Sequence, residues 1–267
     1  MLEVHLDPAT INSRKVLAGL ELLGMPYKIT HVNYFAGAHK QPPYIDLNPN
    51  GTLPAVKDGD FTLWESDAIL QYAADQSGSD KHYPKDPKKR ADVNRWMLWE
   101  AAHWQPSCYV FFIENAVKPL MKAPTDKALV DKEMINWRRL AGILDARLAK
   151  SKWLAGDTVT IADIAVAAPM HMHKRQGLPV DDFPNLKRWI AEVEKLPCWK
   201  KTQGAVEAAL TPHCPASRLP RMGVGPSFAS LGKDTMTVPT TIKSTFNYTR
   251  DTGVAPEIYF YEPPPGT

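Results

Sequence analysis

The first 78 residues alternate between short strand patterns and helical patterns. Residues 2–6 place apolar side chains at every second position, which predicts a strand, and residues 14–24 place them at helical spacing up to Gly24. Residues 27–33 are rich in β-branched and aromatic side chains and again alternate, which predicts a second strand. The spacing of the two strands fits a βαβ crossover, so we expect them to be parallel.

A hairpin and a further helix follow a polar loop that contains a short helical pattern at 42–48. Residues 53–66 indicate two strands joined by an Asp-Gly pair, which favours a two-residue hairpin turn. Ser66 is expected to open and cap the next helix, and Gly78 lies just beyond the end of that helix. The order β-α-β, short helix, β-β-α predicts a thioredoxin-like α/β domain.

The strand patterns stop at Pro84, and long helical patterns take over. Residues 91–117 form one amphipathic stretch that Pro106 should kink. Thr160 and Asp163 have the spacing of a capping box, which predicts a helix start and gives Asp163 a role in folding. Further helices are expected at 127–150, 183–197 and 198–210. The predicted organisation is an α/β domain at 1–78, a linker at 79–89, an all-helical domain at 90–208 and an extended, proline-rich tail at 209–267.

Composition and charge narrow the possible functions. Hydrophobic residues make up 44% and charged residues 23% of the 267 residues, which is typical of a soluble globular protein. No apolar run approaches the roughly 18 residues that a membrane span needs, and the N-terminus lacks the pattern of a signal peptide. We therefore expect a cytoplasmic protein without a membrane partner. A net charge of +3 without a long basic block argues against nucleic acid as a partner.

The three cysteines, Cys108, Cys198 and Cys214, lie far apart and form no Cys-x-x-Cys pair. This spacing argues against a disulfide scaffold, a zinc site or a dithiol redox centre. We therefore expect reduced thiols without a catalytic role, and no metal.

Two segments resemble the cytosolic glutathione transferase superfamily. Residues 48–74 are similar to its glutathione-site segment, and residues 153–167 to the capping-box signature of its helical domain. Residues 7–24 and 36–42 are most similar to the phi class and its bacterial relatives, while Thr10 and Asn12 also resemble the bacterial nu class. The resemblance spans about residues 1–208 and implies glutathione as cosubstrate, a small electrophile as second substrate, and a homodimer.

The chemistry of such an enzyme requires a thiolate. A free cysteine thiol has a pKa of about 8.5, so that only ~3% is ionised at pH 7. A hydroxyl donor contributes about 1.5–3 kcal/mol to a charged acceptor, and a helix N-terminus about 0.3–1 kcal/mol more. The resemblance places the catalytic hydroxyl at Thr10, with Asn12 and Ser13 as further candidate donors. The alternative is that these three side chains only cap the helix.

The resemblance also implies the residues that bind glutathione. A cis peptide before Pro54 would let the backbone of Leu53 pair with the cysteinyl part of the ligand like an added strand. Glu65 and Ser66, at a helix N-terminus, would hold the γ-glutamyl ammonium and carboxylate groups. An Asp at 67 replaces an arginine common in the phi class, which puts any salt bridge of that arginine in doubt.

Two further regions complete the predicted site. His39 and Lys40 resemble the pair that contacts the glycyl carboxylate. We expect the pocket for the electrophile on the first helices of the second domain. The alternative is that the aromatic side chains there belong to the core, since an aromatic stripe at helical spacing is more often core than pocket. Its candidate lining residues are Trp99, His103, Trp104, Tyr109 and Phe112.

Three functions are compatible with these features. The first is conjugation of glutathione to an electrophile, the second is glutathione-dependent reduction of disulfides, and the third is a non-catalytic binding module with the same fold. The tail from about residue 244 resembles the opening of a family of hydroxylases and desaturases related to cephamycin methoxylation. This resemblance implies that the chain derives from a fusion with such a domain, and the alternative is that the tail packs on its own helical domain or on a dimer partner. Two short strands are also expected within the tail.

Overall fold

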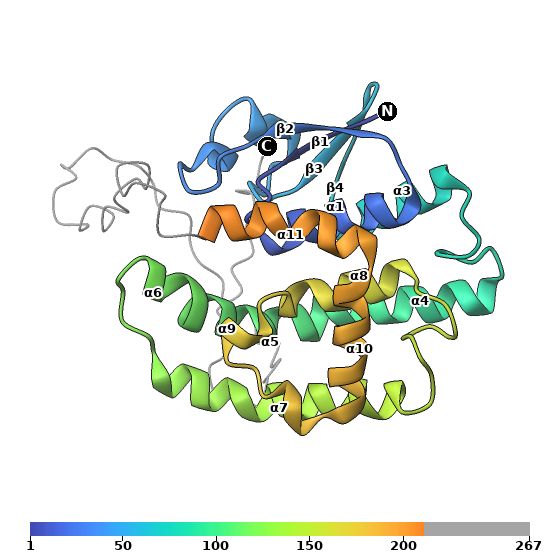
Figure 1. Ribbon diagram of the computed structural model, residues 1–267. Helices are drawn as coiled ribbons and strands as arrows, with labels where there is room; N and C mark the ends of the chain where they lie inside the picture. Colours follow the sequence, from blue (N-terminus) through green and yellow to red (C-terminus); the bar gives the residue numbers. More distant parts are fainter. Residues whose placement is uncertain (211–267) are drawn as a thin grey trace, which may run out of the picture. The chain divides into compact units, whose positions relative to one another are not determined.

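The computed structural model describes residues 1–210 and begins with a four-stranded mixed sheet (Figure 1). The strands are β1 (Leu2–Leu6), β2 (Tyr27–His31), β3 (Ala55–Asp58) and β4 (Phe61–Trp64), in the spatial order β2-β1-β3-β4. β1 is parallel to β2 and antiparallel to β3, which confirms the predicted crossover and hairpin. His5 lies opposite Ala55, and Ala55 lies opposite Trp64. The segments that leave β1, enter β3 and leave β4 therefore meet at one edge of the sheet.

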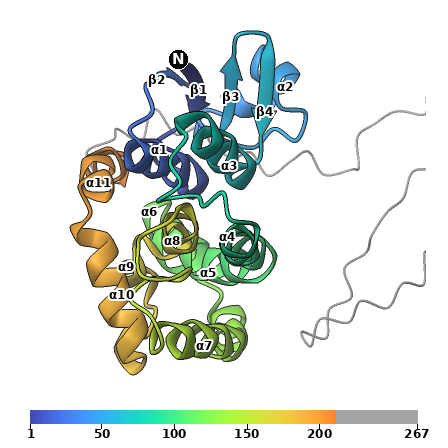
Figure 2. The same ribbon diagram turned by 90° about the vertical axis from the view of Figure 1, so that its right-hand side faces the viewer.

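Two helices, α1 (Ile11–Leu23) and α3 (Ser66–Ser77), cover one face of the sheet (Figure 2). Alternate residues of β1 are buried beneath them, as its apolar-polar pattern predicts. A Cβ atom at Gly19 of α1 would lie 2.1 Å from the Leu70 side chain of α3, so a larger residue there would force Leu70 to move. The opposite face carries the short helix α2 (Tyr44–Leu47), where Tyr44 packs with Ala55 of β3.

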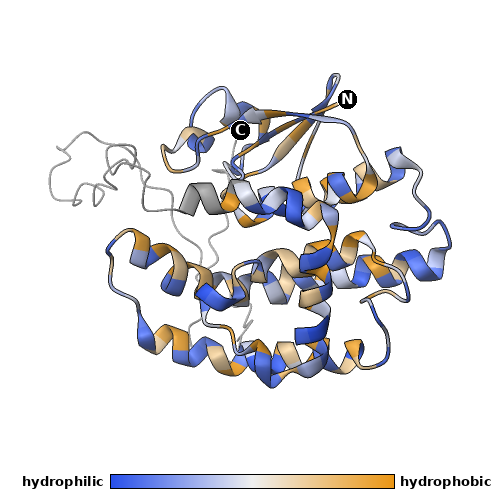
Figure 3. Cartoon of the chain, in the orientation of Figure 1, coloured by the Kyte–Doolittle hydropathy of each residue, from blue (hydrophilic) through white to orange (hydrophobic). Residues whose placement is uncertain are grey.

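From residue 87 onward every described element is helical, which confirms the predicted change of fold class. A continuous run starts with α4 (Pro87–Trp99), α5 (Gln105–Phe111) and α6 (Lys118–Leu120), separated by the π-helical segments η2 (Glu100–Trp104) and η3 (Phe112–Val117). Then follow α7 (Lys127–Leu148), α8 (Ile161–Ala167), α9 (His173–Gln176), α10 (Pro184–Lys195) and α11 (Pro197–Leu210), with short 3₁₀ turns at Ala168–Met170 and Val180–Asp182. In Figure 3 the long helices α7 and α10 alternate between hydrophilic and hydrophobic turns, as expected for helices buried on one side.

Pro106, where a kink is predicted, is the second residue of α5 and directly follows the first π-helical segment. There the backbone N–H of Gln105 bonds the carbonyl of Glu100, five residues earlier. A proline, which has no N–H, fits a place where the helix changes its hydrogen-bond spacing. The structure thus has a π segment before Pro106, and the kink itself stays a prediction.

The capping box at Thr160 and Asp163 is present as predicted. The buried Asp163 carboxylate accepts hydrogen bonds from the backbone N–H groups of Thr160 and Leu154 and from Nε1 of Trp189, each at 2.9 Å. Burial raises the pKa of Asp163, and these donors oppose that change. One carboxylate thus joins the start of α8, the preceding loop and α10.

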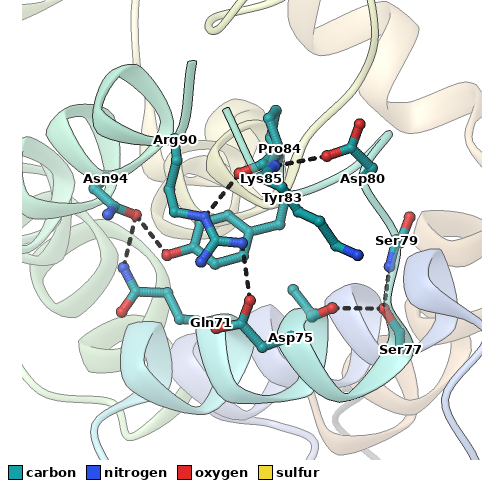
Figure 4. A network of polar contacts seen from close by, with 11 residues as sticks. Gln71, Asp75, Ser77, Ser79, Asp80, Tyr83, Pro84, Lys85, Arg90 and Asn94 are labelled. Carbon is teal, nitrogen blue, oxygen red and sulfur yellow. Dashed lines mark hydrogen bonds and ion pairs between the residues drawn. The ribbon is translucent and has the colours of Figure 1, made fainter. Parts of the chain in front are cut away.

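The connection between α3 and α4 is anchored by Arg90 (Figure 4). Its guanidinium lies over the Tyr83 ring, donates to Asp75 of α3 at 2.9 Å and donates to the Pro84 carbonyl at 2.7 Å. Asn94 accepts hydrogen bonds from the Tyr83 hydroxyl and from Gln71. The predicted boundaries of linker and domains stay a prediction; α4 starts at Pro87, inside the predicted linker.

Among residues 1–210 no helix combines the length and the apolar character that crossing a bilayer requires. The same residues contain no cluster of His, Cys, Asp and Glu side chains that could hold a metal ion. Cys108 and Cys198 are buried free thiols, and burial raises the pKa of both. Cys214, the predicted tail strands and the tail's resemblance to hydroxylases lie outside the described residues.

Candidate active site

The loop that leaves β1 is held by the buried side chain of Asp7. One carboxylate oxygen accepts from the Ala9 N–H and the other from the Tyr34 N–H, both at 3.0 Å. The Asp7 carbonyl also accepts from the backbone N–H of Thr10. These bonds fix Thr10 at the start of α1, at the edge of the sheet where β3 begins and β4 ends.

Thr10 occupies the N-cap position of α1, yet its side chain caps no backbone N–H. Its hydroxyl lies 3.1 Å from the Asp7 carbonyl and 2.6 Å from the hydroxyl of Ser13, which is fully buried. The Asn12 amide oxygen is buried without a partner among the described residues. The interpretation that Thr10 only caps the helix therefore does not hold, and the first N–H groups of α1 remain without a side-chain cap.

The start of α3 differs from the prediction in one respect. The N-cap is Glu65, with a φ of 73°, and Ser66 is the first helical residue. Ser66 is thus not the cap, because the chain turns through the left-handed region one residue earlier. A non-glycine residue in that region costs about 1–3 kcal/mol, and such residues cluster at functional sites. The Glu65 side chain makes no capping bond, so α3 also starts uncapped.

The segment before β3 lies beside these two helix starts. The Leu53–Pro54 peptide is cis, as the resemblance implies. The Thr52 carbonyl, one residue earlier, accepts hydrogen bonds from the Tyr44 hydroxyl at 2.5 Å and from the Asn48 side chain at 2.8 Å. The backbone of Leu53 is therefore held at the same edge as Thr10 and Glu65.

His39 and Lys40 are joined to the same edge through Tyr34. The Tyr34 ring stacks on the largely buried His39 ring at 4.5 Å, and the backbone of Tyr34 bonds Asp7. Burial lowers the pKa of His39, and the Lys40 charge lowers it further. His39 is thus neutral near pH 7, whereas the exposed Lys40 supplies a positive charge; its Nζ donates to the Asn50 carbonyl at 3.3 Å.

The predicted pocket residues fall into two groups. Trp104 is fully buried, donates from Nε1 to the Val166 carbonyl at 3.0 Å and stacks on the half-buried Trp99. The structure therefore makes Trp104 a core residue, and the exposed His103 lies 6.5 Å from the Trp99 ring. Trp99 and Trp104 belong to the same apolar core as Ile11, the residue that directly follows Thr10.

Tyr109 and Phe112 form the second group, with their ring centroids 6.1 Å apart. Tyr109 is partly exposed, and burial first, and then the electrostatic influence of Tyr34, raise the pKa of Tyr109 to about 12. Phe112 packs 5.7 Å from the His171 ring. Tyr109 connects the helical domain to the loop that carries His39 and thereby borders the candidate site.

A buried charge cluster joins the two domains beside the site. The ammonium group of Lys15 on α1 lies 2.7 Å from Glu100 and 3.1 Å from Asp67, directly after Ser66. Burial would lower the pKa of Lys15, but the two carboxylates outweigh it and raise the pKa. Burial also raises the pKa of Glu100 to about 8. Asp67, which replaces the family's arginine, thus makes a salt bridge of its own with Lys15.

Sequence reasoning missed several residues that shape the site. Asp7 and Tyr34 build the loop, and the signal that could have found Asp7 is an acidic residue at the end of a strand and before a proline. The buried Arg14 lies over the Trp199 ring at 4.3 Å and donates to Gln203, so that α11 packs on α1, beside which it lies in both ribbon views (Figures 1 and 2). No local pattern connects residues so far apart.

The fold and this edge define a class of protein: a thioredoxin-like domain with two uncapped helix starts beside a cis-proline, joined to an all-helical domain. Two protein-family models match the chain, "Glutathione S-transferase, N-terminal domain" at residues 11–76 and "Glutathione S-transferase, C-terminal domain" at residues 109–197. The chain belongs to the glutathione S-transferase family, a family of transferases, and the predicted fold is confirmed.

Relatives and solved structures agree with this assignment. A glutathione S-transferase of Hyoscyamus muticus is 34% identical over 192 residues, which cover 70% of this chain and 90% of the relative. The theta-class glutathione S-transferase of Xanthomonas axonopodis pv. citri, solved with glutathione bound, has a TM-score of 0.71 at 29% identity and covers 79% of this chain and 99% of its own. Glutathione S-transferase I from maize, solved with an atrazine glutathione conjugate, has a TM-score of 0.71 at 25% identity and covers 77% of this chain and 98% of its own.

Proposed function

We propose that this protein binds glutathione at the edge formed by Thr10, Leu53 and Glu65 and transfers it, as thiolate, to a small electrophile. The observation that supports this best is the Thr10 hydroxyl, which stands at the start of α1 and caps no backbone N–H. A donor in that position can exchange its bond with the neutral Asp7 carbonyl for a stronger one with a sulfur anion. The bound glutathione in the Xanthomonas relative supports the choice of ligand.

Each part of the tripeptide has a suitable partner in this proposal. The γ-glutamyl carboxylate meets the uncapped N–H groups and hydroxyl of Ser66, and its ammonium group meets Glu65. The cysteinyl backbone pairs with Leu53 beside the cis-proline. The glycyl carboxylate lies near Lys40, with the neutral His39 as a hydrogen-bond donor.

The reaction needs only the stabilised sulfur anion and a positioned electrophile. The thiol proton passes to solvent, and the Thr10 hydroxyl and the uncapped N–H groups of α1 stabilise the thiolate. The thiolate attacks an electrophilic carbon, a C–S bond forms, and a leaving group departs or an epoxide opens. Tyr109 and Phe112 are the proposed contacts for the electrophile, because they border the edge that holds the sulfur.

The test is a panel assay with glutathione and an aryl halide, an epoxide, a peroxide or a mixed disulfide. Thr10→Ala should lose about tenfold to a thousandfold in turnover, the range for removal of one donor to a developing anion. Thr158→Ala, at an exposed threonine of the helical domain, is the matched control and should keep full activity. Turnover of the mixed disulfide alone would favour the reductase function. Absence of glutathione binding by calorimetry would refute the proposal.

We also propose that the protein acts as a homodimer, with the first domain of one copy against the second domain of the other. β4 is an edge strand that exposes Phe61 and Trp64, and α4 exposes Leu98. Exposed apolar side chains on an edge strand favour association. Phe61→Asp should convert a dimer to a monomer in analytical ultracentrifugation, and a monomeric wild type would contradict this proposal. A cytoplasmic location stays a prediction of the sequence.

A further inference from the structure

The hydroxyl groups of Thr10 and Ser13 lie 2.6 Å apart, the distance of a strong hydrogen bond between two hydroxyls. Ser13 is fully buried on the first turn of α1, whereas Thr10 is partly exposed at the site. Within residues 1–210, the Ser13 hydroxyl has Thr10 as its one described hydrogen-bond partner. The Ser13 hydroxyl therefore contacts the Thr10 hydroxyl from the protein interior.

The direction of this bond follows from counting protons. The Thr10 oxygen is also 3.1 Å from the Asp7 carbonyl, which can only accept. If Thr10 donated to Ser13, the proton of the buried Ser13 would have no described acceptor, at a cost of about 1–3 kcal/mol. If Ser13 donates to Thr10, then Thr10 donates to the Asp7 carbonyl and both protons are used. The second arrangement is the one that satisfies both groups.

A bound thiolate changes one of these two hydrogen bonds, the bond from Thr10 to the Asp7 carbonyl. The sulfur competes with the neutral Asp7 carbonyl for the Thr10 proton, and a charged acceptor forms the stronger bond. Thr10 can rotate its proton to the sulfur while its oxygen keeps the bond from Ser13. A hydroxyl that accepts one hydrogen bond is a better donor in the next, because the two bonds polarise each other.

We propose that Ser13 is a positioning residue, which donates to Thr10 and thereby strengthens the bond from Thr10 to the glutathione thiolate. This inference rests on the proposed function. Ser13 acts through Thr10 in this proposal. Its hydroxyl is fully buried and bonded to Thr10, so Thr10, and not Ser13, donates to the ligand.

The decisive measurement is the pKa of bound glutathione, obtained from the ultraviolet absorbance of the thiolate as a function of pH. Ser13→Ala should raise this pKa, and kcat/KM at pH 6.5 should fall about threefold to tenfold, equivalent to half a pH unit to one unit. The dissociation constant for glutathione should change less than about twofold, and the rate should recover above the raised pKa. A merely structural loss would lower the rate at every pH.

The double variant shows whether Ser13 acts through Thr10. In the Thr10→Ala background, Ser13→Ala should have no further effect on the thiol pKa; an additive effect would mean that Ser13 bonds the sulfur directly and would overturn the inference. Ser107→Ala, which removes another buried serine hydroxyl bonded to Glu133 on α7, is the matched control. If Ser13→Ala does not fold, Ser13→Cys keeps a weaker donor of similar size and should raise the pKa by less.

The two proposals can fail separately. An undepressed thiol pKa in the wild type, or an unchanged pKa in Thr10→Ala, would refute the proposed function. A depressed pKa that rises in Thr10→Ala and stays constant in both Ser13 variants would refute only the role of Ser13.

Discussion

Four helices of the helical domain and the two long helices of the sheet domain start in different ways. In the helical domain, carboxylate or hydroxyl side chains bond the first backbone N–H groups of four helices: Asp86 at α4, Asp126 at α7, the Thr160 box at α8 and Asp145 at α10. In the sheet domain, α1 and α3 begin at Thr10 and Glu65, neither of which makes a side-chain cap. Helix caps stabilise the helical domain, whereas uncapped starts leave N–H groups for an anionic ligand.

The largest expected effect is at the Asp163 box. Asp163→Ala would leave three buried donors, on Leu154, Thr160 and Trp189, without an acceptor. Because each such donor costs about 1–3 kcal/mol, the free energy of unfolding should fall by about 3 kcal/mol or more. Urea denaturation measures this loss, and glutathione affinity of the remaining folded protein should stay within about twofold. A loss under about 1 kcal/mol would show that this cap does not carry the stability we assign to it.

This box also shows which parts of the fold sequence reasoning reaches. The box, the hairpin turn and the βαβ crossover depend on residues close in sequence, and each was predicted. The left-handed φ of Glu65 was not, because a glutamate before a helix carries no local signal for it. An aromatic stripe likewise did not separate the buried Trp104 from the exposed Tyr109, since helix packing decides which side is covered. The contacts of Lys15 with Glu100 join residues 85 apart in sequence.

The next effect concerns the buried cluster of Lys15, Asp67 and Glu100, which joins the two domains. The pKa of Glu100 is about 8 in the folded protein, above the ordinary carboxyl value. The native state therefore holds an extra proton between about pH 5 and 8, and stability falls as pH rises through that window. We expect the free energy of unfolding to decrease from pH 6 to pH 8. Glu100→Gln, measured by urea denaturation at both pH values, should remove most of this slope; an unchanged slope would show that Glu100 is not its source.

A substitution at Glu65 tests whether the uncapped start of α3 lowers the stability of the protein. Glu65→Gly should raise the free energy of unfolding by about 1 kcal/mol, because glycine adopts the left-handed conformation without strain. The same change should weaken glutathione binding, because the carboxylate proposed to meet the ligand's ammonium group is lost. Lys122→Gly is the matched control: Lys122 also has a positive φ, of 55°, but lies in the helical domain. It should gain stability and keep glutathione affinity; a loss of affinity there would break the distinction.

The smallest effect separates the two kinds of helix start most directly. Asp126 caps α7 through the N–H of Leu129 at 3.0 Å, so Asp126→Ala should cost about 1 kcal/mol of unfolding free energy and leave turnover unchanged. Thr10→Ala removes no cap, and in the Ser13→Ala background it leaves no buried hydroxyl without a partner, so there it should cost less than about 0.5 kcal/mol while it lowers turnover. Thermal and urea unfolding of both variants without ligand give the comparison. If Thr10→Ala lost as much stability as Asp126→Ala, its hydroxyl would serve the fold, and the contrast between a domain built for stability and an edge kept for a ligand would fail. If it lost none, the result would support the proposal that this hydroxyl serves a bound anion.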